Sequence, residues 1–234
     1  MVHFYKKTHT YDEYPPTPLL AFFLRYPNPF ARHVLCVDVL SRTIDPHTGQ
    51  IRTLRLILKR GLVPAWASKW LPLPSGSGGR GLDAWVLEES VVDPPGWGFD
   101  GTPEEVAAKR EEARRRREKS KGKMKEEDEE SYLSQPRLKS TQGNLSHKKF
   151  MHVVEGAELC SGREGTTLHH TTAEVRSQFG GSWGKLIRDK IESYGANKLP
   201  GNTDRAREGM SLIMGLLRRR EKGQPTDTPE PPSA

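Results

Sequence analysis

Alternation of apolar and polar residues predicts β-strands over much of the chain. Residues 3–11 are rich in strand-forming side chains, and residues 82–93 alternate. In the stretch 51–60, three leucines share one face while Thr53, Arg55, Ile57 and Lys59 share the other, because successive side chains of a strand point to opposite sides. A turn cluster at 45–49 precedes this stretch, which predicts a hairpin with the strand before it.

The stretch 21–42 joins an apolar helix to a strand. The helix is expected over residues 19–25 and ends before Pro27 and Pro29, because the residue before a proline is driven out of the helical region. From 33 to 40, apolar side chains fall on both faces of the predicted strand. Strands of this kind are covered on both sides, so we expect a helix or a cavity over each face.

The second half of the chain begins with a charged stretch and ends in helices. Residues 104–130 hold opposite charges at i,i+4 spacing but scarcely an apolar stripe, which predicts a solvated helix or disorder that does not dock on a core. Three further strands are predicted, at 139–142, 145–156 and 166–179. A loop is expected at 157–165, and two helices follow, one capped by Ser182 and one starting near Thr203.

This order of elements indicates an α+β fold, with an antiparallel sheet and helices packed on one face. One domain is expected over residues 1–222. A charged insertion, helical or disordered, interrupts it at about 95–136, and the proline-rich tail 223–234 is expected to be disordered.

Composition favours a polyanionic partner. The net charge is +7 and the isoelectric point is near 9.4, which suits nucleic acid, an acidic membrane surface or an anionic ligand without choosing among them. The two cysteines have no disulfide or zinc spacing, and no apolar run is long enough to span a membrane. The N-terminus has the pattern of neither a signal peptide nor a presequence.

Catalytic and nucleic-acid-binding patterns are weak. The sequence has no glycine-rich phosphate loop, no Gly-x-Ser-x-Gly and no metal-ligand spacing, and His169 and His170 should face opposite sides of a strand. We therefore expect no enzyme, cofactor or metal. The basic run 114–117 would suit nucleic acid, but acidic flanks nearly neutralise it and no aromatic residues interleave. A solvated linker is the favoured interpretation.

A set of cations is the more informative candidate site: Arg25, Arg55, Lys59, Lys198 and Arg205. Each could be an ordinary surface cation. However, Arg25 follows an apolar helix, and Arg55 and Lys59 share the strand face expected to oppose the helices. Cations clustered at a cavity need an anion to offset their desolvation, and a phosphate headgroup fits, since arginine binds phosphate bidentately. Asn202 could cap the last helix and contact the same phosphate.

The loop 61–81 is unusually apolar. Trp66, Trp70 and Leu71 lie in it, between Gly61 and a Ser/Gly run at 75–79 that could act as hinges. Such a loop suits a cover over a cavity or a membrane-touching tip, although the tryptophans could also be ordinary core.

Several ordered motifs resemble the PRELI-domain family. The first is Arg25-Tyr-Pro-Asn-Pro29, followed by His33-Val and by residues 38–42. The other similar segments, in order, are Arg52-Thr-Leu-Arg55, Pro64-Ala-Trp66, Glu88-Glu-Ser-Val-Val-Asp93, Asn144-Leu-Ser-His147, Lys190-Ile-Glu192 and Arg205-Ala-Arg-Glu-Gly-Met210. The sequence departs from the family pattern at Arg205, where a lysine is usual, at Leu58, where a basic residue is common, and in the charged insertion.

The resemblance implies a lipid carrier of the mitochondrial intermembrane space, in the branch that carries phosphatidic acid for cardiolipin synthesis. It implies a curved sheet and a long helix that enclose a pocket for one phospholipid. The implied headgroup residues are Arg25, His33, Arg55, Lys59, Lys198, Asn202 and Arg205, and the implied lid residues are Val63, Trp66, Trp70 and Leu71. The implied partners are anionic membrane surfaces, touched transiently, and a small helical protein with twin Cys-x9-Cys motifs.

Three other functions stay open at this point. A family member of this kind could carry phosphatidylserine instead. The protein could also bind acidic lipid as a regulator without transferring it. The third, a basic RNA-binding protein acting through residues 104–130, is the least favoured.

Overall fold

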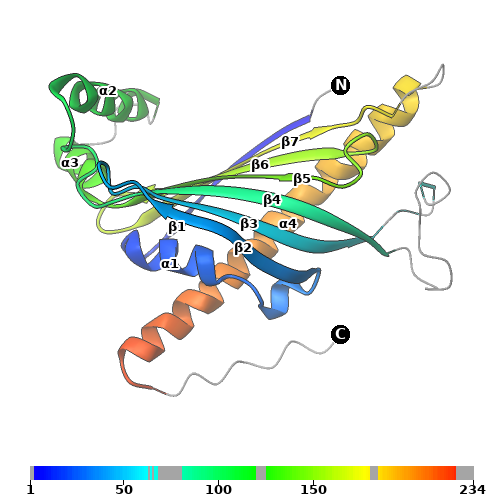
Figure 1. Cartoon of the computed structure of the whole chain (residues 1–234), viewed down its shortest axis with the longest axis horizontal. Helices are drawn as coiled ribbons and strands as arrows, with labels where there is room; N and C mark the ends of the chain where they lie inside the picture. Colours follow the sequence, from blue (N-terminus) through cyan, green and yellow to red (C-terminus); the bar gives the residue numbers. More distant parts are fainter. Residues whose placement is uncertain are drawn as a thin grey trace.

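The computed structural model describes residues 3–62, 64, 66, 67, 81–119, 125–179 and 184–224. The elements are β1 (His3–Tyr11), α1 (Pro16–Leu24), the 3-10 helix η1 (Pro29–Ala31), β2 (Val34–Ile44), β3 (Ile51–Leu62), β4 (Gly81–Asp93), α2 (Pro103–Lys119), α3 (Glu126–Ser134), β5 (Arg137–Asn144), β6 (His152–Ser161), β7 (Thr167–Arg176) and α4 (Gly184–Glu221). The strands form one antiparallel sheet of seven, in the order β1-β7-β6-β5-β4-β3-β2 (Figure 1). The predicted α+β class is confirmed.

Helices α1 and α4 pack on one face of the sheet, which we call the inner face (Figure 1). The core there joins the strands to both helices through Tyr11, Leu19, Ala21, Phe22, Leu138, Leu159, Met210 and Met214. Each large apolar side chain that is fully buried contributes roughly 1.5–3 kcal/mol. The predicted alternation in β3 is confirmed, because Thr53, Arg55 and Ile57 are buried on this face.

The predicted cover over both sides of β2 is wrong. β2 is the last strand of the sheet, and several of its apolar side chains are exposed, Val39 by 54%, Leu40 by 53% and Ile44 by 66%. The helices pack against other strands, among them β1, β5 and β6, so the apolar character of β2 gives little burial. Sequence pattern alone could not identify which strand would lie at the edge.

The loop between the last two strands is shorter than predicted, because residues 157–161 belong to β6 and the loop covers only 162–166. The predicted strand 145–156 is wrong in its first half, where the chain turns at 145–151 between β5 and β6. His147 has a left-handed backbone with φ 58°, and the Asn144 side-chain amide donates to the carbonyls of Ser146 (2.6 Å) and Met151 (2.9 Å). These hydrogen bonds stabilise a turn in a region whose apolar pattern predicted a continuous strand.

The two predicted C-terminal helices are one continuous helix. α4 passes through Pro200, whose missing N–H removes one bond of the helical ladder without ending it. Gly209 packs against Asn28 and Leu199 against Ala173 and Val175, so tertiary contacts support the helix on both sides of the proline. Asn202 therefore lies inside α4, and its predicted role as an N-cap is wrong.

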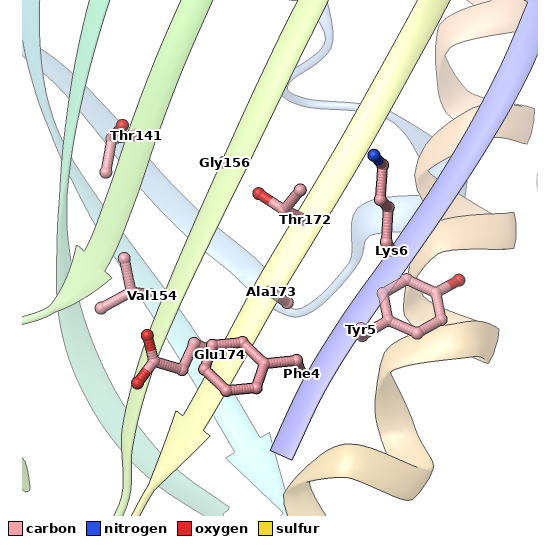
Figure 2. Close-up of a pocket in the computed structure, with 9 residues that line it drawn as sticks. All are labelled: Phe4, Tyr5, Lys6, Thr141, Val154, Gly156, Thr172, Ala173 and Glu174. Atoms are coloured by element: carbon pink, nitrogen blue, oxygen red, sulfur yellow. The ribbon is translucent and has the colours of Figure 1, made fainter. Parts of the chain in front are cut away.

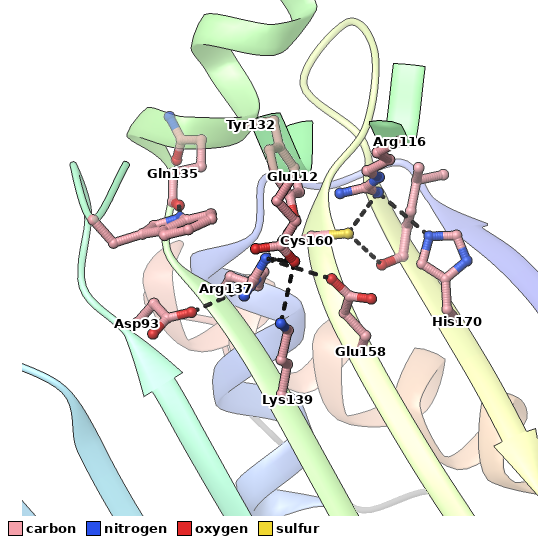
Figure 3. A network of polar contacts seen from close by, with 12 residues as sticks. Asp93, Glu112, Arg116, Tyr132, Gln135, Arg137, Lys139, Glu158, Cys160 and His170 are labelled. Carbon is pink, nitrogen blue, oxygen red and sulfur yellow. Dashed lines mark hydrogen bonds and ion pairs between the residues drawn. The ribbon is translucent and has the colours of Figure 1, made fainter. Parts of the chain in front are cut away.

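The charged insertion is helical among its described residues, and it docks on the sheet. Its helices α2 and α3 pack on the outer face through Ala113, Tyr132, Leu133 and the preceding Trp97, against Cys160. Buried charges assist: Arg137 of β5 bonds Asp93 and Glu112 (Figure 3). The expectation that it would not dock is wrong, because a few apolar residues, most of them outside the charged stretch 104–130, and specific ion pairs replace the missing stripe.

Some predictions fall outside the described residues, among them the Ser182 cap and the disorder of the tail from 225 onward. Within the part of the chain that the structure describes, no helix is long and apolar enough to cross a membrane. The same residues hold no group of three metal-ligating side chains.

Candidate functional site

Two arginines and one glutamate form a buried cluster on the inner face. Arg25 follows the last turn of α1, Arg55 lies in β3, and Glu88 is the directly paired residue of β4. Their exposures are 7%, 3% and 1%. Arg55 Nε donates to Glu88 Oε1 at 2.8 Å, and Arg25 Nη2 donates to Glu88 Oε2. Glu88 thus accepts from both guanidinium groups, one on each carboxylate oxygen.

The remaining guanidinium donors are held by the end of α1. Arg25 Nη1 donates to the carbonyl of Phe22 at 2.8 Å, and Arg55 Nη1 donates to that of Phe23 at 3.1 Å. The carbonyls at a helix C-terminus lack helical partners, so these bonds complete α1 while orienting both arginines. The ring of Phe22 lies under Arg25, 3.6 Å from its Cζ to the ring centroid. The two arginines therefore link the end of α1 to strands β3 and β4.

Electrostatics favour the ionised forms of this cluster. Burial alone would raise the pKa of Glu88, but the charges of Arg25 and Arg55 lower it below the usual range. Burial lowers the pKa of Arg55, helped by the neighbouring charge of Arg25. Since arginine stays protonated in proteins, both guanidinium groups are cationic. One carboxylate faces two cations, which leaves positive charge in excess.

Further polar groups extend the site along the inner face. Lys59 Nζ donates to Gln142 Oε1 at 3.3 Å, and the Gln142 amide donates to Glu155. The pKa of His33 is lowered, first by burial and then by the charges of Lys59 and Arg205, so the imidazole is favoured in its neutral form. The charge of Lys59 therefore acts on His33, and their shared role at a headgroup stays a prediction.

Helix α4 carries the other predicted residues on one side. Lys198, Asn202 and Arg205 have i,i+4,i+7 spacing, which places them on one helical face. Lys198 Nζ lies 5.7 Å from the centroid of the Tyr194 ring, and Arg205 Nε donates to the Gly201 carbonyl at 3.4 Å. Asn202 and Arg205 are exposed. The charge of Arg205 also contributes to the lowered pKa of His33, which directly precedes β2.

Of the predicted lid residues, only Trp66 lies within the described residues. Its ring meets Tyr194 edge to face with centroids 6.2 Å apart, and Lys190 Nζ lies 4.9 Å from its centroid. Trp66 therefore lies against the N-terminal half of α4. Val63, Trp70 and Leu71 lie outside the described residues.

Sequence reasoning missed the anion of the cluster. Glu88 was recognised only as part of a strand motif, although it alternates with Val86 and Ser90 on a buried face. An acidic residue at an inward position is a signal that a buried cation must face it. Tyr26 was also missed: its pKa is lowered, because the charges of Arg25 and Lys59 outweigh the opposing effect of burial.

A separate pocket of about 480 Å³ lies on the outer face of the sheet (Figure 2). Phe4 and Lys6 of β1 border it, and Gly156 of β6 forms its floor beside Thr172 of β7. A side chain at Gly156 would meet Thr172 Oγ1 at 2.6 Å, so the floor depends on glycine. This pocket is on the other face from the arginine cluster and shares no residue with it.

Comparisons with known proteins agree with the motif resemblance. Residues 19–96 match the model of the PRELI-like family. The chain is 27% identical over 218 residues to the protein UPS1, mitochondrial, of Saccharomyces cerevisiae, covering 93% of this chain and 95% of that protein. It is 25% identical over 196 residues to the ups1 homolog of Schizosaccharomyces pombe, covering 83% of this chain and 84% of that protein.

Shorter and weaker similarities accompany these. PRELI domain-containing protein 1, mitochondrial, of Homo sapiens is 36% identical over 74 residues, which are 32% of this chain and 31% of that protein. Among solved structures, the Zhui aromatase/cyclase from Streptomyces overlaps with a TM-score of 0.47 at 10% identity, covering 96% of this chain and all of that one. A likeness of that degree says nothing about a ligand.

Proposed function

Because residues 19–96 match the PRELI-like family model and the chain is similar to a mitochondrial protein over most of its length, we propose that it is a phospholipid carrier of that family that moves phosphatidic acid between the outer and inner mitochondrial membranes. The observation that carries the proposal is the excess of buried positive charge on the inner face. Among the described residues, Arg25 and Arg55 share one carboxylate, that of Glu88, and the part-buried Lys59 adds a further cation. A buried field of this sign is costly unless an anion shares it.

The chemistry of phosphatidic acid suits this field better than that of phosphatidylserine. A phosphomonoester carries roughly 1.5 to 2 negative charges near neutral pH and three acceptor oxygens. A serine headgroup adds an ammonium, which Arg25, Arg55 and Lys59 would repel, and a carboxylate that offsets it. Its phosphodiester carries a single negative charge, so its net negative charge is smaller than that of a phosphomonoester. We therefore assign the headgroup contact to Lys59, with His33, Lys198, Asn202 and Arg205 at the opening, and with Arg25 and Arg55 supplying the field behind them.

The transfer cycle needs no bond to be made or broken. Basic residues draw the protein to an anionic bilayer, each well-placed one contributing about 1 kcal/mol. The apolar segment with Val63, Trp66, Trp70 and Leu71 enters the interface as a lid, the acyl chains enter between the sheet and α4, and the cations hold the phosphate. A mitochondrial intermembrane-space location, a small helical partner with twin Cys-x9-Cys motifs, and a supply of phosphatidic acid for cardiolipin synthesis belong to the same proposal.

Lys59→Ala tests the headgroup assignment. A substitution such as Arg25→Glu would place two carboxylates together in a buried site, so it would disturb the fold before it reported on lipid. Loss of one charged hydrogen bond of roughly 1.5–3 kcal/mol predicts at least a tenfold lower rate of phosphatidic acid transfer for Lys59→Ala. Labelled phosphatidic acid, phosphatidylserine and phosphatidylcholine are compared between donor and acceptor liposomes.

The matched control is Arg52→Ala on the same strand, where the side chain is 59% exposed and faces Glu89 at 3.8 Å. It should transfer lipid like the wild type. Equal transfer by wild type and Lys59→Ala would remove Lys59 from the headgroup site and keep the carrier. Preferred transfer of phosphatidylserine would replace the cargo. Binding of acidic lipid without transfer would leave a regulator in place of a carrier.

A further inference from the structure

Helix α1 presents an uncovered apolar side. Leu20 and Leu24 are one helical turn apart and are 49% and 47% exposed, while Leu19 and Phe22 on the other side are buried against the sheet and α4. α1 itself contains no charged residue. A hydrophobic stripe of this kind has no role in the core of the described residues, because the inward side of α1 already supplies that core.

Cations border this stripe at both ends. At its start, α4 ends with Arg218, Arg219 and Arg220, all exposed and followed by Lys222. Arg218 Nη1 bonds Glu13 Oε1 at 3.2 Å, which places the end of α4 beside the residues that lead into α1.

At the other end of the stripe, the Cζ atom of Arg42 lies 5.7 Å from the ring centroid of Phe23, and Arg32 is exposed just after η1. The carboxylates in these segments are Asp12, Glu13, Asp38 of β2 and Glu221, so the segments hold six cations and four anions.

We propose that α1 and the basic end of α4 form a membrane-contact surface for anionic bilayers. Exposed leucines beside arginines are the combination by which amphipathic helices enter the lipid interface, with the apolar side chains in the acyl boundary and the cations at the headgroups. The stripe and its basic rim match such a surface in both respects. This inference does not depend on the transfer of lipid proposed above.

The surface is distinct from the segment that contains Trp66. Trp66 packs on Tyr194, whereas α1 packs on Met210 and Met214. At 1.5 Å per residue, the twenty residues from Tyr194 to Met214 separate the two regions by roughly 30 Å along α4. In Figure 1, α1 and the C-terminal half of α4 lie together, away from the end of the sheet where β3 ends and β4 begins. The protein thus offers a bilayer two contact regions.

Vesicle binding by the full chain tests the proposal. Vesicles of phosphatidylcholine, with or without phosphatidylglycerol, are used so that the probe differs from the proposed cargo. We expect Leu20→Ser with Leu24→Ser to lower binding to the phosphatidylglycerol vesicles about tenfold. We expect Arg219→Gln with Arg220→Gln to lower it about thirtyfold, and to weaken its dependence on salt.

Matched controls separate this surface from general charge and stickiness. Arg114→Gln with Arg115→Gln removes two exposed cations of α2, and Phe99→Ser removes a side chain that is 41% exposed on the insertion. Both should bind vesicles like the wild type. Circular dichroism melts show whether each variant is folded. If the Leu20→Ser, Leu24→Ser double variant is unfolded, the Leu24→Ser single variant is used in its place.

The outcomes are decisive. Wild-type vesicle binding by folded α1 and α4 variants would overturn the proposal and leave the carrier function standing. Unchanged vesicle binding with loss of a co-expressed helical partner would also overturn it, and would make the stripe a protein interface. If the variants bind vesicles more weakly and the wild-type protein never loads phospholipid, the membrane-contact surface would be supported and the carrier function would be overturned.

Discussion

Two buried arginine clusters among the described residues differ in their charge balance. On the inner face, two guanidinium groups share Glu88. On the outer face, Arg137 lies 3.2 Å from Asp93, 3.0 Å from Glu112 and 3.9 Å from Glu158, and Lys139 lies 3.3 Å from Glu112 (Figure 3). The chemistry is the same, but the outer cluster supplies its own neutralising anions and the inner one does not.

This difference in charge balance indicates that the outer cluster has a structural role, whereas the inner cluster can bind a ligand. Arg137 is satisfied within the protein, since it also donates to the Tyr132 hydroxyl at 2.6 Å and lies over the ring of Trp97, with its Cζ 4.2 Å from the centroid. It holds the insertion to the sheet. The inner cluster retains positive charge that another anion can share, and so it is the place where an anionic ligand gains most. The ratio of buried cations to buried anions therefore indicates whether a cluster can bind a further ion.

Glu88→Gln is expected to have the largest effect on stability, because it removes the anion of the inner cluster. It leaves two buried guanidinium groups without their carboxylate, so we expect the free energy of unfolding to fall by about 3–5 kcal/mol. Urea denaturation followed by circular dichroism measures the change. The adjacent Glu89→Gln, on an exposed pair, should cost at most about 1 kcal/mol. Equal costs for the two variants would show that the inner cluster is not electrostatically coupled.

The pH dependence of stability sharpens the comparison next. His169 faces the inner side, where burial and the charge of Arg25 lower its pKa to about 4 from 6.5. Between these values the unfolded chain binds the proton and the folded protein does not, so this contribution is complete above pH 6.5 and is lost as pH falls toward 4. The shift corresponds to about 3 kcal/mol.

His169→Gln should therefore flatten the stability profile between pH 6.5 and 4, as measured by urea denaturation at a series of pH values. His47→Gln, in the exposed turn after β2, is the control. A profile that keeps its slope in the His169 variant would assign the pH dependence to other groups.

Arg137→Met should have the smallest effect of the three. Asp93 stays buried and loses its cation, while Glu112 and Glu158 are 47% and 32% exposed at their side chains and regain water. We expect a loss of about 2 kcal/mol in the free energy of unfolding, with faster proteolysis of the insertion. Lys139→Ala, 48% exposed beside Glu112, is the control. Lipid transfer should be unaffected, and a change in transfer would connect the insertion to the carrier function.

Sequence reasoning located most of the sheet but not its edges. The strand at 51–60, its hairpin and the inward side of Arg55 followed from alternation, because a period of two directly reports which residues share a face. The apolar pattern of its partner β2 predicted a strand covered on both faces, yet β2 is largely exposed at the edge of the sheet. The position of a strand within a sheet depends on long-range pairing, which periodicity within one segment does not contain.

The sequence by itself determined the fold class, the family motifs and the cations of the candidate site, because these depend on local periodicity and on residue identity. Tertiary structure alone decided that Glu88 would lie between Arg25 and Arg55, that α4 would continue through Pro200, and that Arg137 would fasten a charged insertion. Each of these is a contact between distant segments. Desolvation and charge pairing take effect only when such segments meet, so no local pattern encodes them.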